Sequence, residues 1–109
     1  MGSRKPSSRW HEVSATAEVI AQAGRRLERS SARLTTAPEE LAAARDALLV
    51  VTAAGARLAR QLDMLSNEYD APGLVEPSAV HIALDQAAAA AEDLGNCTKV
   101  AAQAIEDGA

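Results

Sequence analysis

Residues 41–69, LAAARDALLVVTAAGARLARQLDMLSNEY, decide the fold class of this chain of 109 residues. Apolar or small residues recur along the stretch at alternating intervals of three and four, from Leu41 to Tyr69. This is the heptad spacing of helices that pack side by side along a narrow seam. Gly55 occupies one seam position, although glycine inside a helix costs about 1 kcal/mol relative to alanine. Close packing against a neighbouring backbone would explain why glycine is tolerated there.

The same spacing predicts a helix on each side of this stretch. In the first, at about residues 9–34, the seam starts at Trp10 and then alternates aliphatic residues (Val13, Ile20, Leu27, Leu34) with small ones (Ala17, Gly24, Ser31). The small column is expected to admit a neighbouring backbone. In the last, at about residues 77–107, the seam comprises Val80, Leu84, Ala87, Ala91, Leu94, Thr98, Ala101 and Ile105. The pair Gly95-Asn96 interrupts helix propensity there and predicts a kink or a short break.

Two short breaks separate these helices. Thr36 and Glu39 fit a capping box, with Pro38 tolerated in the first helical turn. Residues 70–77 contain a Pro-Gly pair and a second proline, which indicates a loop. Short connections favour antiparallel neighbours, so we expect an all-α, up-down-up antiparallel three-helix bundle with alanine-rich heptad seams. It spans residues 9–109, with helices at about 9–34, 37–70 and 77–107, after a flexible basic arm at 1–8.

The composition gives this bundle a thin core. The chain has 26 alanines but only one Trp, one Tyr and no Phe. Some large apolar residues also lie off the three seams, and a second burial surface would account for them. We therefore expect a homodimer or higher oligomer, and Trp10 either plugs one end of the core or anchors a partner. The expected interface residues are Trp10, Leu49, Val50, Ile82 and Val100.

Several function classes are disfavoured. The sequence contains no apolar run of membrane-spanning length and no secretory signal, and a single cysteine suits a reducing compartment, so we expect a cytoplasmic protein. His11 and Cys97 lack partners for catalysis, and His81 is expected to be a surface histidine near Asp85. No enzyme activity, cofactor, metal or small-molecule substrate is therefore expected.

Charge is divided unevenly along the chain. Residues 1–60 carry ten Lys/Arg against six Asp/Glu, whereas residues 61–109 carry one Lys against nine Asp/Glu. The basic residues that could contact phosphates are Arg4, Lys5, Arg9, Arg25, Arg26, Arg29 and Arg33. Pairing inside the bundle is the favoured alternative. It would place Arg26, Arg29 and Arg33 near Glu106 and Asp107, and Arg4, Lys5 and Arg9 near Glu68, Asp70 and Glu76.

These observations favour a non-enzymatic helical module that associates with protein, either as a homo-oligomer or as an adaptor for a larger partner. The alternative is a nucleic-acid-binding accessory protein that uses the basic arm and the arginine face of the first helix. The alanine- and arginine-rich, lysine-poor composition is also typical of a high-GC bacterial genome.

Overall fold

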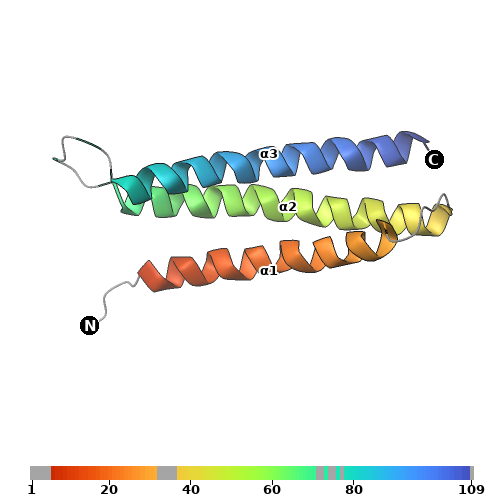
Figure 1. The fold of residues 1–109 in the computed structure, drawn as a ribbon, viewed down its shortest axis with the longest axis horizontal. Coiled ribbons are helices and arrows are strands. Elements are labelled where there is room, and N and C mark those ends of the chain that lie inside the picture. Colours follow the sequence, from red (N-terminus) through yellow and green to blue (C-terminus); the bar gives the residue numbers. More distant parts are fainter. Residues whose placement is uncertain (1–5, 32–36, 71–72, 74–75, 77, 109) are drawn as a thin grey trace.

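In a computed structural model of the chain, residues 6–31, 37–70, 73, 76 and 78–108 are described. They form three helices, α1 (Pro6–Ser31), α2 (Pro38–Glu68) and α3 (Ala79–Gly108) (Figure 1). The described ranges contain no strand. The prediction of an all-α fold with three packed helices is therefore confirmed.

The helices form an open layer with α2 in the middle. α1 and α3 run in the same direction and α2 runs opposite to both (Figure 1). α2 packs against each outer helix, whereas the described parts of α1 and α3 do not contact each other. The molecule accordingly measures 57 × 29 × 19 Å. Each outer helix is thus left with one side that no other described helix covers.

The first turn of α2 is capped differently from the prediction, and that of α3 has a serine cap. The N-cap of α2 is Ala37, which makes no side-chain hydrogen bond, and Pro38 follows in the first turn. A capping box would need Thr36 as the N-cap, and Thr36 lies outside the described residues. α3 is capped by a residue that the sequence reading passed over, because the Ser78 hydroxyl accepts the backbone N–H of His81 at 2.9 Å.

α2 and α3 approach each other at a pair of glycines. A Cβ atom at Gly55 would lie 3.2 Å from both the carbonyl oxygen of Ala91 and the nitrogen of Gly95. A Cβ atom at Gly95 would lie 3.3 Å from the carbonyl oxygen of Thr52. The expectation of close packing at Gly55 is confirmed. The predicted short break at Gly95-Asn96 was wrong, since α3 is continuous there, and Gly95 lies at the contact between the helices.

The small column of α1 behaves differently. Gly24 is exposed, and a Cβ atom there would meet nothing within 4 Å. α1 instead places Thr16 and Ala23 in the buried positions facing α2. The predicted approach of a neighbouring backbone at Ala17 and Gly24 was therefore wrong. The residues that face α2 each lie one position earlier in the sequence.

Two small apolar clusters hold the layer together. The first joins all three helices, and its buried members are Leu62, Leu65, Leu84, Ala88 and Ala91, with Val13, Leu58, Ala59 and Tyr69 packed against it. The second joins α1 and α2, and contains Ala23, Ala47 and Val51, with Ile20, Leu27 and Val50 packed against it. Half of the eight buried members are alanine, so the core is as thin as the composition suggests.

A hydroxyl pair lies beside the glycine contact. Thr52 Oγ1 and Thr98 Oγ1 are 2.9 Å apart, and each hydroxyl also lies within hydrogen-bond distance of a carbonyl of its own helix. We expect Thr98→Val to lower the free energy of unfolding by about 1 kcal/mol, because one hydrogen bond between the helices is lost. Adding Thr52→Val should then cost little more. Urea unfolding of the two single variants and the double variant measures this coupling, and strictly additive losses would contradict it.

Candidate protein-interaction surface

α3 has two apolar stripes, and only one of them packs on α2. The packed stripe comprises Leu84, Ala88, Ala91, Gly95 and Ala102. The second stripe, here called the α3 seam, recurs at intervals of three and four and comprises Val80, Ala83, Ala87, Ala90, Leu94, Cys97, Ala101 and Ala104. No member is charged, and all but the half-buried Ala101 are exposed. Val80 and Leu94 expose 47% and 39% of their surface, so about seven turns of this helix present an unpartnered apolar stripe.

α1 carries a similar stripe of smaller residues. This α1 flank comprises Trp10, Ser14, Ala17, Ala21 and Gly24, and every member is uncharged and exposed. Trp10 exposes 40% of its surface and supplies the largest side chain of the flank. The rest of the flank offers a shallow, smooth surface because none of its other side chains is larger than serine.

The α1 flank and the α3 seam lie on the same face of the layer. Helical residues advance by about 100°, and each stripe is centred roughly 100° from the side of its helix that faces α2. Viewed from the N-terminal ends of α1 and α3, the direction from the α2-facing side of the helix to its stripe is clockwise in α1 and anticlockwise in α3. Since α2 lies on opposite sides of these parallel helices (Figure 1), both rotations end on one face.

Contacts at one end of the layer agree with this placement. The Trp10 indole Nε1 donates a hydrogen bond of 3.4 Å to the Tyr69 hydroxyl. Tyr69 packs against the first cluster, which contains Leu62 of α2 and Leu84 of α3. Trp10 is therefore tied to this end of the face while it exposes 40% of its surface, and its role as an anchor for a partner stays a prediction.

The other expected interface residues are scattered. Val50 is half-buried and packs against the cluster between α1 and α2, so contacts within the chain already account for it. Leu49, Ile82 and Val100 are exposed, Val100 to 69%. Ile82 lies beside Asp85 and Gln86 on α3, and Val100 beside Asn96 and Gln103, and isolated exposed apolar side chains are common on protein surfaces. None of these four residues belongs to the α3 seam or the α1 flank.

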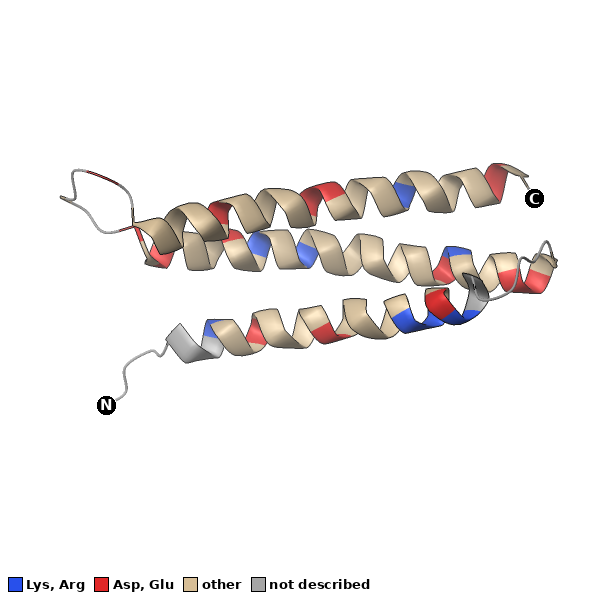
Figure 2. Ribbon diagram, in the orientation of Figure 1, with Lys and Arg blue, Asp and Glu red and all other residues tan. Residues whose placement is uncertain are grey.

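The basic residues that the structure describes are partly engaged in ion pairs. Arg9 is hydrogen-bonded to Glu68, as the internal pairing predicted. Arg25 lies 3.2 Å from Glu18 on its own helix. Arg26 and Arg29 are exposed near the C-terminal end of α1 (Figure 2), whereas Arg4, Lys5 and Arg33 lie outside the described residues.

Glu106 has a different partner from the one expected. Arg45 of α2 donates a hydrogen bond of 2.7 Å to Glu106 and another to the neighbouring Asp46. These bonds, to Asp46 first and then to Glu106, raise the pKa of the Arg45 guanidinium above its ordinary value. The expected pairing of Glu106 with the arginines of α1 was wrong, because the described parts of α1 and α3 do not touch.

His81 serves as a tie between two helices. Its Nδ1 lies 2.8 Å from the carbonyl oxygen of Ser66, so this nitrogen carries the proton and donates it. The Ser66 hydroxyl in turn donates to the carbonyl oxygen of His81. His81 is therefore half-buried between α2 and α3, and its hydrogen bonds go to Ser66 rather than to the expected Asp85.

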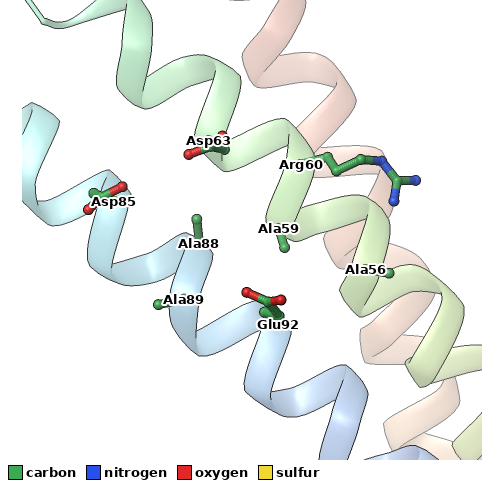
Figure 3. A pocket seen from close by; sticks show the side chains of 8 residues that line it. All are labelled: Ala56, Ala59, Arg60, Asp63, Asp85, Ala88, Ala89 and Glu92. Atoms are coloured by element: carbon green, nitrogen blue, oxygen red, sulfur yellow. The ribbon is translucent and has the colours of Figure 1, made fainter.

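A pocket of about 440 Å³ lies between α2 and α3. Half of its lining residues are alanines, and Asp63, Asp85 and Glu92 supply the carboxylates. Figure 3 shows the Arg60 side chain pointing away from these carboxylates. Among the described residues, no group of three His, Cys, Asp or Glu side chains is arranged to hold a metal ion.

The seam expected from the sequence for α3 matches the side that packs on α2 only in part. It mixed members of both stripes, such as Leu84 and Leu94, because each lies at heptad spacing from the next. The existence of a second apolar side could have been found from the sequence. Ala83, Ala90 and Ala104 extend the apolar surface to a second side of the helix, and all five acidic residues of α3 lie off that side.

None of the described helices is long and apolar enough to cross a membrane. Comparisons of the chain with protein-family models, with curated proteins and with solved structures gave no match.

Proposed function

We propose that this protein acts without catalysis, by associating with another protein through the face that the α1 flank and the α3 seam share. The observation that supports this proposal is the α3 seam itself, an uncharged stripe about seven turns long that no described helix covers. Monomeric proteins rarely expose a continuous apolar patch of this length, and such patches mark sites of association with other proteins. Burial against a partner helix gives that pattern a physical reason.

The arrangement of the arginines gives less support to nucleic-acid binding. Arg9 and Arg25 each have a carboxylate partner within the chain, and the acidic residues of α3 would repel phosphates. A duplex- or single-strand-binding role therefore stays a prediction from the sequence. It would show as binding that weakens steeply as salt is raised.

Cys97 offers a direct test of the proposed function because it is the only cysteine and lies exposed on the α3 seam. In cells that make the protein, a partner on this face should slow alkylation of Cys97 at least tenfold relative to a peptide of residues 92–102. A Val100→Cys, Cys97→Ala variant places the thiol off the seam and serves as the control, which should react at the peptide rate. Equal rapid alkylation at positions 97 and 100 would contradict association through this face.

A further inference from the structure

We propose that the partner is a second copy of this chain, in a two-fold dimer in which the α1 flank of each copy covers the α3 seam of the other. This inference rests on the proposed function and names the partner. It follows from the fact that one face carries both stripes and that they differ in kind. After Trp10 the α1 flank is made of small residues, whereas the α3 seam presents Val80 and Leu94 among its alanines.

The symmetry of the pairing follows from the layer. Two copies can pack face to face about a two-fold axis that runs parallel to the helices between them. This operation reverses the order of the helices across the layer and keeps their direction. α1 of one copy then lies over α3 of the other, parallel to it, and α2 lies over α2.

A two-fold axis parallel to the helices leaves the position of each residue along the helix direction, here called its level, unchanged. Residues of the two copies that lie at the same level would therefore meet. Ala23 packs with Val51, next to the Thr52–Thr98 hydroxyl pair, so Gly24 and Thr98 lie at about the same level. Ala17 lies two turns earlier in α1. Leu94 therefore faces the stretch between Ala17 and Gly24 of the second copy.

That stretch can receive a leucine. A Cβ atom at Gly24 would meet no atom within 4 Å, and the side chain of Ala17 is only a methyl group. A large side chain entering a gap between small ones is the knob-into-hole contact of paired helices. It would also supply a reason for Gly24, which has no packing role within the chain.

Charge is compatible with this pairing, because no member of the α1 flank or the α3 seam is charged and their contact would bury no ion. The alternative axis, perpendicular to the helices, would pack α3 on α3 and α1 on α1. The larger side chains of the α3 seam would then meet another α3 seam instead of the small residues of the α1 flank.

The face is large enough for a stable dimer. A specific interface buries about 800 Å² on each partner. The broad face of the layer measures 57 by 29 Å, so about half of its projected area would suffice. The α1 flank and the α3 seam together run along most of its length.

Sedimentation velocity of the full chain over a range of concentrations tests the dimer. The matched variants are Ala90→Arg, on the α3 seam, and Ala89→Arg, its neighbour on the other side of the same exposed helix. The wild type and Ala89→Arg should sediment as dimers at micromolar concentrations. Ala90→Arg should weaken dimerisation at least about a hundredfold, because symmetry buries its charge twice. A monomeric wild type, or equal effects of the two variants, would overturn the proposal.

Gly24→Leu tests the pairing of the helices independently of α3. It fills open space in the monomer, so the circular dichroism of the monomer should be retained, but it occupies the room expected for Leu94 of the second copy. We expect a loss of dimerisation of at least tenfold. A dimer that Ala90→Arg disrupts and Gly24→Leu leaves intact would show α3 packed on α3, and would overturn this pairing. A monomeric wild type whose Cys97 is nevertheless protected in cells would leave the proposed function standing and exclude the second copy as partner.

Discussion

Leucine in place of Gly55 is expected to lower the free energy of unfolding by about 3 kcal/mol. The closest atoms to a side chain at this position belong to the backbone of Ala91 and Gly95, at 3.2 Å. Backbone atoms cannot rotate out of the way, so α2 and α3 would have to separate along their length. Separation would also break the Thr52–Thr98 contact. Chemical denaturation followed by circular dichroism measures this loss of free energy of unfolding. Leucine has a higher helix propensity than glycine, which would stabilise the helix, so helix propensity cannot cause the loss.

The same change to alanine at two glycines separates packing from helix propensity. In the monomer, Gly24→Ala should raise the free energy of unfolding by about 1 kcal/mol, because alanine favours the helix and meets no neighbour within the chain. Gly55→Ala should lower it despite the same gain in propensity. If both variants were stabilised equally, the close approach of α2 and α3 at Gly55 would be contradicted.

Truncation of Leu65 to alanine is expected to cost about 3 kcal/mol. Leu65 is fully buried in the cluster that joins all three helices, and its loss would leave a cavity in a core that has few large side chains. A domain of this size has a total stability of about 5–15 kcal/mol, so the variant should unfold at a much lower denaturant concentration.

Leu49→Ala is the matched control for this truncation. Leu49 lies on the same helix but exposes 45% of its surface, so its removal should cost less than about 0.5 kcal/mol. Equal losses at positions 49 and 65 would mean that Leu65 is not the centre of the core, or that Leu49 is buried in an assembly.

The number and approximate extent of the helices could be predicted from the sequence because heptad spacing and the proline-containing breaks are local features. The open layer could not. Periodicity shows that a side of a helix is apolar, but it does not show which neighbour covers that side. In α3 two apolar stripes lie next to each other, and the sequence alone gives no reason to assign Leu84 to α2 and Leu94 to the free face.

In α1 the buried column differs from the expected one for a more specific reason. Val13, Ile20 and Leu27 fit a heptad with the small column at Ala17 and Gly24, and equally one with Thr16 and Ala23. The seam expected from the sequence used the first of these columns. In the structure Thr16 is buried with its hydroxyl donating to the carbonyl oxygen of Glu12 at 3.1 Å, so burial leaves no unpaired donor.

Methyl NMR of the full chain with a soluble paramagnetic relaxation agent tests the central claim most directly. Leu94 and Val100 lie on the same helix and are both exposed within one chain. As the protein concentration rises through the dimerisation range, the Leu94 methyl groups should become shielded from the agent while Val100 remains fully relaxed. If both residues stay equally accessible at millimolar concentration, the face formed by α1 and α3 does not bind a second copy.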